Sequence, residues 1–207
     1  MPDFDPADVL PDRPKEERPK PILRALRVFL VGAVGLVGLF LAVVAAYLLG
    51  VVPGFRTYRI TADSMAPTLV PEEHIVADMR YFQNHPPTRG DVVVFRFLSS
   101  TGDAMLTKRV VGLAGDVISG APGLLVVNGQ AAREPYVKAE LEDLPYDARE
   151  TFGPLVVPPN QVFLMGDNRQ RSYDSRYYGP VPVGQLKGKV LYISWSKELR
   201  RIGKRVE

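Results

Sequence analysis

A serine and a lysine stand in segments of this sequence that could bring them together as a nucleophile and its base. Ser64 opens the stretch Ser64–Leu69, and Lys108 lies inside the mostly apolar stretch Met105–Val111. A serine hydroxyl needs a base to remove its proton, and a neutral lysine amine can serve as that base. The chain contains no cysteine and only two histidines, so it offers few residues for other routes to acyl transfer.

The surroundings of Lys108 suit such a base. If its segment forms a strand, Lys108 shares one face with Leu106 and Val110, because side chains alternate between the two faces. Burial among apolar groups disfavours the charged amine and lowers the pKa of a lysine. Taken alone, the segment favours a simpler interpretation, a surface lysine whose amine reaches solvent past apolar neighbours. The assignment therefore depends on the rest of the sequence.

A long apolar run precedes Ser64. The run from Val28 to Val52 carries no charge. As a helix it would extend about 37 Å, enough to cross a hydrocarbon core about 30 Å thick, and Pro53 and Gly54 would end it. The alternative is a cleavable signal peptide, but the apolar region of such a peptide is only about 7 to 15 residues long. The run therefore predicts a transmembrane helix.

The distribution of charge predicts the orientation of this helix. Six basic residues precede it and two follow it closely: Arg13, Lys15, Arg18, Lys20, Arg24 and Arg27, then Arg56 and Arg59. Basic residues favour the cytoplasmic side, which predicts a disordered cytoplasmic tail (1–27), a transmembrane helix (28–52) and an extracytoplasmic domain (53–207). The lipid bilayer is the expected partner. A net charge of +3 with no basic stripe argues against nucleic acid.

The outer domain has the pattern of a β protein. Short β-like runs separated by Gly and Pro predict strands at 58–61, 74–78, 91–97, 106–113, 117–119, 124–127, 162–165 and 189–195. Asn128-Gly129 predicts a hairpin turn. Residues 133–159 are polar and read as a long excursion from the sheet. The basic C-terminal end is expected to be a solvated helix or tail, with Lys197, Arg200, Arg201, Lys204 and Arg205.

Four ordered motifs after the apolar run resemble those of the type I bacterial signal peptidase family. They are SMAPTL at 64–69, RGDVV at 89–93, KRVVGLAGD at 108–116 and GDNRQRSYDSRYYG at 166–179. The resemblance covers about residues 28–195. It implies a mostly β domain of antiparallel sheets that lies outside the cytoplasm and belongs to a protein of the bacterial cell membrane. It also implies a serine endopeptidase that removes signal peptides from exported preproteins and needs no cofactor or metal.

The resemblance also implies roles for single residues. Ser64 would be the nucleophile, Lys108 the general base, and Ser172 would orient the lysine amine. A supporting charge cluster would be formed by Arg109, Asp174 and Arg176, and the loop that carries Ser172 would be shaped by Gly166, Asp167 and Asn168. Asp167 and Asp174 could also be read as paired catalytic carboxylates, but the nearby arginines favour ion pairing.

The family's substrates carry small residues at positions −3 and −1 of the cleavage site, which implies two shallow apolar pockets. An extended substrate is expected to add to the sheet as a β-strand. The residues expected to line its site are Tyr58, Ile60, Ala62, Met65, Met105, Leu106 and Thr107. The Ser64 N–H would donate to the oxyanion. Ala62 stands where many members have a hydroxyl donor, so the second donor stays unassigned.

Two other functions are compatible with a serine and a lysine in a β domain. One is an autoproteolytic switch like that of SOS-repressor-type proteins, but the chain has no DNA-binding module, and the apolar run would be unexplained. The other is an inactive membrane-anchored binding module, which the presence of Ser64, Lys108 and Ser172 argues against. Cleavage of a model preprotein, cleavage of the chain itself, and no cleavage would distinguish the three.

Overall fold

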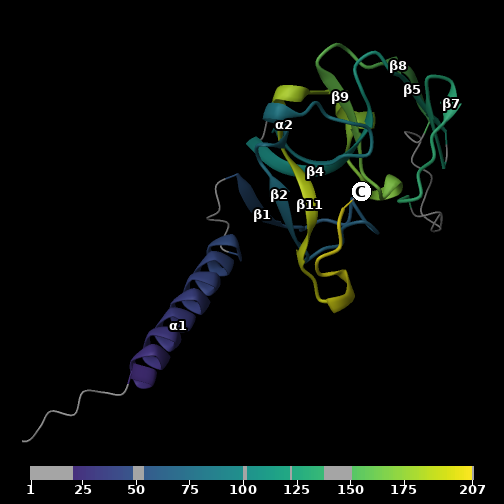
Figure 1. The fold of residues 1–207 in the computed structure, drawn as a ribbon. Coiled ribbons are helices and arrows are strands. Elements are labelled where there is room, and N and C mark those ends of the chain that lie inside the picture. Colours follow the sequence, from purple (N-terminus) through teal and green to yellow (C-terminus); the bar gives the residue numbers. More distant parts are fainter. Residues whose placement is uncertain (1–20, 49–53, 100–101, 122, 138–150, 207) are drawn as a thin grey trace, which may run out of the picture. The chain divides into compact units, whose positions relative to one another are not determined.

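The computed structural model describes residues 21–48, 54–99, 102–121, 123–137 and 151–206. These residues form an N-terminal helical unit and a β unit, divided between Ala45 and Ala46 (Figure 1). Most of the predicted tail lies outside the described residues.

Helix α1 (Pro21–Leu48) is apolar along most of its length. A proline suits the first position of a helix because an N–H group at that position would have no partner within the helix. The segment Ala25–Ala46 is long and apolar enough to cross a membrane, and side chains such as Phe29 are exposed. The helix begins earlier than predicted, because residues 21–27 are helical. The predicted end of the span, residues 49–52, lies outside the described residues.

A seven-stranded sheet forms the larger part of the β unit, in the order β1-β2-β11-β3-β4-β9-β10. Every pairing is antiparallel, as expected. The strands are β1 (Phe55–Arg59), β2 (His74–Asp78), β3 (Val92–Ser99), β4 (Gly102–Gly112), β9 (Gln161–Met165), β10 (Val181–Pro182) and β11 (Leu186–Trp195). Strand β1 ends earlier than predicted, which leaves Thr61 for the loop that carries Ser64.

A smaller antiparallel sheet follows the order β7-β6-β5-β8. Its strands are β5 (Val117–Ala121), β6 (Leu124–Val127), β7 (Gln130–Ala131) and β8 (Phe152–Val156). The predicted turn is confirmed between β6 and β7, where Asn128 and Gly129 have φ angles of 53° and 78°, as a two-residue hairpin turn requires. Strand β8 corrects the prediction that residues 133–159 leave the sheet. Its Pro154 obscured the strand pattern, and a proline fits an edge strand.

Short helical turns connect the strands. They are α2 (Tyr81–Asn84), η3 (Arg169–Arg171), α3 (Ser175–Tyr178), η4 (Val183–Gln185) and η5 (Leu199–Arg201). In α3, the Asp174 carboxylate accepts a hydrogen bond from the Arg176 N–H, which satisfies an N–H group that the first turn leaves without a partner.

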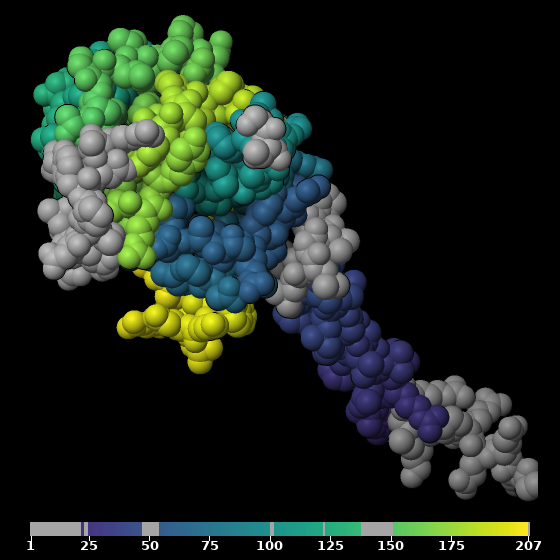
Figure 2. Space-filling model, turned by 180° about the vertical axis from the view of Figure 1, so that it is seen from behind, coloured from purple at the N-terminus to yellow at the C-terminus, as the bar shows by residue number. Residues whose placement is uncertain are grey.

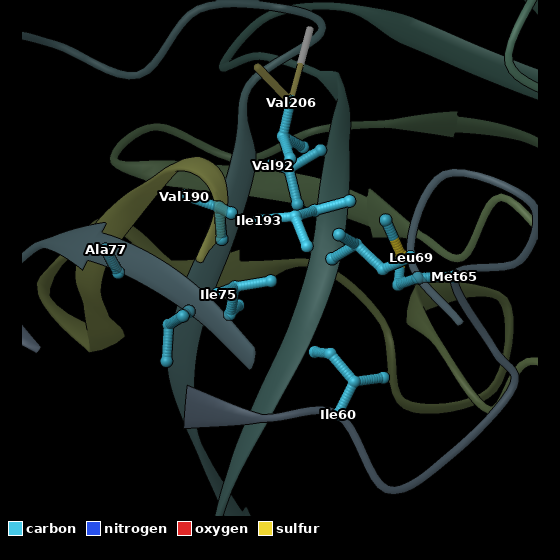
Figure 3. Close-up of a cluster of buried hydrophobic side chains, with 10 residues drawn as sticks. Ile60, Met65, Leu69, Ile75, Ala77, Val92, Val190, Ile193 and Val206 are labelled. Carbon is cyan, nitrogen blue, oxygen red and sulfur yellow. The ribbon is translucent and has the colours of Figure 1, made fainter. Parts of the chain in front are cut away.

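Three clusters of apolar side chains hold the β unit together. The first joins Met65 and Leu69 to β2, β3 and β11 (Figure 3). The second contains Val93, Phe95 and Val110, and the third lies between β9 and the smaller sheet. In the register of β3 and β4, Val93 pairs with Lys108 and Phe95 with Leu106. Lys108 therefore lies on the face that forms the second cluster, as alternation predicted.

Candidate active site

Ser64 and Lys108 are brought together from two separate parts of the chain. Ser64 lies in the loop of residues 61–70 between β1 and β2, which we call the nucleophile loop. Lys108 lies in β4. The Lys108 Nζ donates a hydrogen bond to the Ser64 Oγ at 2.6 Å. This distance lets a proton pass directly between the two atoms when the amine is neutral.

Burial sets the proton affinity of Lys108. The residue is only 4% exposed, and this loss of water lowers the pKa of its amine from 10.5 to about 8. The charges of Asp174 and Asp167 act in the opposite direction but do not outweigh burial. An amine with this pKa is partly neutral in mildly alkaline solution, which suits a general base.

Ser172 is buried and lies close to the half-buried Ser64, with Gly166 between them. It is 5% exposed, and its hydroxyl oxygen has no hydrogen-bond partner among the described residues. A Cβ atom added at Gly166 would lie 2.2 Å from the Ser172 Oγ and 2.4 Å from the Ser64 carbonyl oxygen. The absence of a side chain at Gly166 is what lets these two serines approach each other. The proposed contact between Ser172 and the lysine amine stays a prediction.

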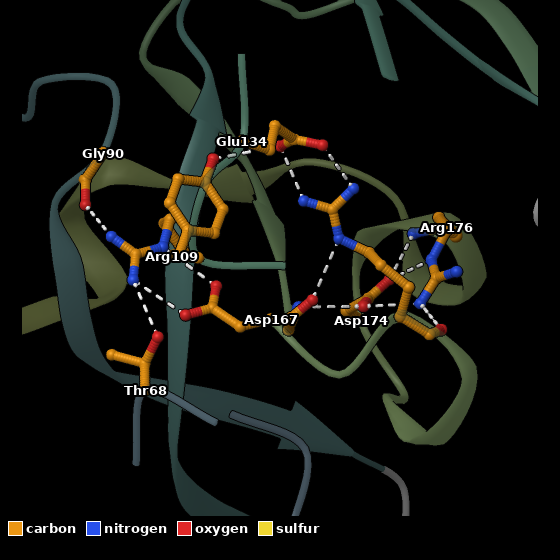
Figure 4. A network of polar contacts seen from close by, with 10 residues as sticks. Thr68, Gly90, Arg109, Glu134, Asp167, Asp174 and Arg176 are labelled. Atoms are coloured by element: carbon orange, nitrogen blue, oxygen red, sulfur yellow. Dashed lines mark hydrogen bonds and ion pairs between the residues drawn. The ribbon is translucent and has the colours of Figure 1, made fainter. Parts of the chain in front are cut away.

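Arg109 follows the lysine and points to the other face of β4. It is fully buried, and its guanidinium donates to both carboxylate oxygens of Asp167, at 2.9 and 2.7 Å (Figure 4). It also donates to the Gly90 carbonyl at 2.8 Å and more weakly to the Thr68 hydroxyl at 3.4 Å. Thr68 belongs to the nucleophile loop, so Arg109 connects that loop to the loop after β9.

A second buried ion pair joins Asp174 to Arg176. The Arg176 Nε donates to an Asp174 oxygen at 2.9 Å, and the other oxygen accepts from the Gly166 N–H at 3.0 Å. Arg176 also donates to the Arg169 carbonyl at 2.6 Å. The three residues predicted as one charge cluster thus belong to two ion pairs, because Arg109 takes Asp167 as its partner. Each of these two buried carboxylates, Asp167 and Asp174, has its own arginine.

Sequence reasoning missed a third part of this network. Glu134 accepts two hydrogen bonds from the Arg169 guanidinium, at 2.8 and 2.6 Å, and one from the Tyr136 hydroxyl at 2.9 Å. The Arg109 guanidinium lies 3.9 Å from the centre of the Tyr136 ring, at cation–π distance. Glu134 is 35 residues from Arg169, and no local spacing in the sequence indicates this pair.

One edge of β4 is open beside Ser64 and Lys108. Strand β9 pairs with β4 only at Arg109, Val110 and Gly112. Residues 102–108 therefore have no strand on the side away from β3, within the described part of the chain. Met105 is 44% exposed along this edge, and Leu106 and Thr107 are half-buried. The edge leads directly to Lys108, as strand addition by a substrate would require.

The other residues predicted to line the substrate site differ in exposure. Ala62 is exposed and Tyr58 half-buried, while Ile60 and Met65 are 7% and 1% exposed and belong to the first core cluster. A cavity of about 620 Å³ lies on another side of the nucleophile loop, lined by Asp63, Ala66, the smaller sheet and the loop after β9. None of the seven predicted substrate-binding residues lines this cavity.

Comparison with known proteins gives a consistent result. The family model described as "Signal peptidase, peptidase S26" matches residues 33–195. "Signal peptidase I" of Bacillus caldolyticus is 33% identical over 148 residues, which cover 68% of this chain and 80% of the relative. "Signal peptidase I" of Leptolyngbya laminosa is 32% identical over 154 residues, covering 69% and 72%. A solved signal peptidase I from Enterococcus faecalis V583 aligns with a TM-score of 0.42 and 31% identity, over 51% of this chain and 97% of that one.

Proposed function

This chain belongs to the signal peptidase I family, and on that premise we propose that Ser64 and Lys108 are its nucleophile and general base. The family's members are serine endopeptidases that remove signal peptides from preproteins by a Ser–Lys mechanism. The observation that carries the assignment to these two residues is the 2.6 Å contact between the Lys108 Nζ and the Ser64 Oγ.

The first step is attack by Ser64. Neutral Lys108 accepts the hydroxyl proton while the Ser64 Oγ bonds to the carbonyl carbon before the scissile bond, and that carbonyl oxygen becomes an oxyanion. The Lys108 ammonium then gives its proton to the leaving nitrogen, the carbon–nitrogen bond breaks, and the new N-terminal amine departs. The signal peptide remains as an ester on Ser64.

The second step hydrolyses the ester and regenerates the free enzyme. Lys108, neutral again, accepts a proton from water, and the resulting hydroxide bonds to the ester carbon. Collapse of this intermediate breaks the ester bond, returns the proton from Lys108 to the Ser64 Oγ and releases the signal peptide as a carboxylic acid, which loses its proton to solvent. One peptide bond and one water molecule are consumed, and neither step needs a cofactor.

The oxyanion of each step needs hydrogen-bond donors. The Ser64 N–H is the first candidate, since it donates no hydrogen bond to another main-chain group of the described residues. The methyl group of Ala62 cannot donate, so the second donor is another group. The open edge of β4 would hold the substrate as an added strand, with main-chain hydrogen bonds that do not depend on the signal peptide's sequence.

The apolar helix α1 would anchor the enzyme in the membrane. The excess of basic residues before the uncharged run that begins at Val28 supports a cytoplasmic N-terminus and an extracytoplasmic catalytic domain. Protease added outside spheroplasts should then digest the chain after residue 53. Protection of the catalytic domain until the cells are lysed would contradict this orientation.

Cleavage of a model preprotein in detergent tests the function. Wild type should cut at one site after a small residue, whereas Ser64→Ala and Lys108→Ala should fold and leave the preprotein intact. Cleavage of the chain itself without cleavage of the preprotein would favour an autoproteolytic switch. No cleavage of either would favour a binding module.

A further inference from the structure

The C-terminal segment packs against the β unit through Arg201 and Val206, whereas the other basic residues of the predicted solvated end, Lys197, Arg200, Lys204 and Arg205, are exposed as expected. After η5 the chain returns along β11, where the Ile193 N–H donates to the Lys204 carbonyl and the Val206 N–H to the Leu191 carbonyl, both at 3.0 Å. Val206 is 7% exposed and belongs to the first core cluster. Figure 2 shows the C-terminal segment, in yellow, beside the blue part of the chain that follows α1.

Within the turn η5, only Arg201 is directed inward. The side chain of Arg200 is 86% exposed and that of Arg201 only 15%. The Arg201 Nε donates to one carboxylate oxygen of Glu73 at 2.6 Å, and its Nη2 donates to the other at 3.0 Å. This two-point geometry is specific to arginine. Glu73 itself is 1% exposed, so the pair is fixed inside the domain.

The same pair holds the nucleophile loop near its end. The Arg201 Nη2 also donates to the Thr68 carbonyl at 3.0 Å and to the Pro67 carbonyl at 3.3 Å. The Glu73 carboxylate accepts from the Val70 N–H at 2.9 Å.

Glu73 also contacts Ile60, the residue immediately before the start of this loop. Its main-chain carbonyl accepts from the Ile60 N–H at 2.8 Å. The pair therefore contacts both ends of the loop that carries Ser64, without touching Ser64 itself.

We propose that Arg201, held by Glu73, is a positioning residue that fixes the nucleophile loop so that Ser64 meets Lys108. This inference rests on the proposed function of Ser64. Arg201 lies beyond residues 33–195, the part that the family model matches, so it extends the catalytic machinery into the C-terminal segment. A buried ion pair contributes little net stability compared with an apolar replacement of both residues, although removing one partner alone is strongly destabilising. A small misplacement of a reacting group can in addition cost about 100-fold in rate, which is measured on protein that is still folded.

The experiment compares Arg201→Ala and Arg201→Lys with Arg200→Ala, a control on the same turn whose side chain is exposed. For each, kcat and KM are measured on the preprotein well below the unfolding temperature. Arg201→Ala should lower kcat about 10- to 100-fold and change KM little, because the open edge of β4 is untouched. Arg201→Lys, which keeps a charge but not the two-point geometry, should be intermediate. Arg200→Ala should match wild type.

Hydrogen exchange of residues 61–73, measured by mass spectrometry, reports directly how firmly the nucleophile loop is held. Exchange should be faster in Arg201→Ala than in wild type and unchanged in Arg200→Ala. A wild-type kcat in folded Arg201→Ala, or equal effects of the two alanine variants, would overturn the proposal. If Arg201→Ala does not fold, Arg201→Lys and Glu73→Gln are measured in its place. A wild-type kcat in both of these variants would overturn the proposal. If wild type itself does not cleave, the proposed function fails, and hydrogen exchange still decides the positioning role.

Discussion

Two lysines of the same sheet, Lys108 on β4 and Lys189 on β11, have surroundings that shift the pKa of the amine in opposite directions. Lys108 contacts the neutral hydroxyl of Ser64 and has no ion pair within the described part of the chain. The Lys189 Nζ lies 2.7 Å from a carboxylate oxygen of Asp91 and 4.7 Å from the centre of the Tyr81 ring. The Lys108 amine is buried without an ion-pair partner among the described residues, and the Lys189 amine is paired with Asp91.

The pKa values of the two amines differ accordingly. Burial is the largest influence on both and lowers the pKa in each case. At Lys108 it prevails and brings the pKa to about 8. At Lys189 the hydrogen bonds and charges of Asp91 and Tyr81 together outweigh it and raise the pKa above 10.5. Acids do lie near Lys108, but arginines bind them. This pairing leaves the buried Lys108 amine with a lowered pKa in a domain rich in carboxylates.

Exchanging each lysine for arginine tests whether this difference matters for catalysis. Arginine keeps the positive charge but does not deprotonate near neutral pH. Lys108→Arg should therefore lower kcat/KM on the preprotein at least about 10³-fold, within the range expected for loss of a general base. Lys189→Arg should stay within about twofold of wild type, because arginine can still pair with Asp91. Circular dichroism would establish that both fold, and a fully active, folded Lys108→Arg would exclude lysine as the base.

Two glycines allow the same comparison for packing. A Cβ at Gly166 would lie 2.2 Å from the Ser172 Oγ, and one at Gly188 would lie 2.7 Å from the Asp78 carbonyl oxygen. Both substitutions create a clash, but only the first displaces groups beside Ser64. Gly166→Ala should lower kcat about 100-fold. Gly188→Ala should cost about 1–3 kcal/mol of stability and keep kcat near wild type below its unfolding temperature. Equal losses of kcat in the two variants would show that the site is no more sensitive than the rest of the sheet.

Replacing each lysine by methionine should change stability in opposite directions. The difference between 10.5 and about 8 in the Lys108 pKa corresponds to about 3 kcal/mol at neutral pH. Lys108→Met removes this penalty but also loses the hydrogen bond to Ser64, about 1 kcal/mol, so a net gain of about 2 kcal/mol is expected. Lys189→Met leaves Asp91, whose side chain is 4% exposed, without its cation and should lose about 2 kcal/mol.

Denaturant unfolding at several pH values would separate these effects. Because the folded pKa of Lys108 lies below its unfolded value, the unfolded state binds more protons between about pH 8 and pH 10.5. The contribution of Lys108 makes wild-type stability rise with pH through this window, and Lys108→Met should lack this contribution. A loss of stability in Lys108→Met at neutral pH would mean that burying the charged Lys108 amine does not lower the free energy of unfolding.

The pH dependence of activity should report Lys108 alone. A base must be neutral to act, so kcat/KM should fall as pH decreases through the lysine's pKa of about 8, by about tenfold for each pH unit below it. Lys189→Arg should show the same acid limb as wild type, because the charge at that position does not take part. An acid limb centred below pH 6 in wild type would indicate that another group is the base.

The comparison also shows which features the sequence predicts well. Strands β2 and β6 begin and end where predicted, because each is a short apolar run bounded by turn residues. The alternation around Lys108 placed its side chain on the correct face. The motifs that resemble the family indicated Ser64 and Lys108. The Ser64 Oγ and the Lys108 Nζ lie 2.6 Å apart, although 44 positions separate the two residues in the chain.

Features that depend on a distant partner were not predictable in this way. Arg201 is paired with Glu73 across 128 positions, and nothing in the basic C-terminal pattern distinguishes it from the exposed Arg200. Arg109 binds Asp167 rather than Asp174 because it lies on the opposite face of β4 from Lys108, and that choice depends on how the loop after β9 folds. The identity of an ion pair is decided by tertiary packing, which local spacing does not contain.

The smallest expected effect concerns Ser172, whose hydroxyl is buried without a partner among the described residues. Leaving a buried hydroxyl without a hydrogen bond costs about 1–3 kcal/mol, so Ser172→Ala should fold and be as stable as wild type or slightly more stable. If the hydroxyl orients the Lys108 amine during the reaction, the same variant should lose several-fold in kcat and shift the acid limb, since Ser64 and Lys108 both remain. Measured together, unfolding and the pH profile distinguish the roles. A more stable variant with an unchanged kcat and acid limb would make Ser172 a packing residue and leave the lysine positioned by β4 alone.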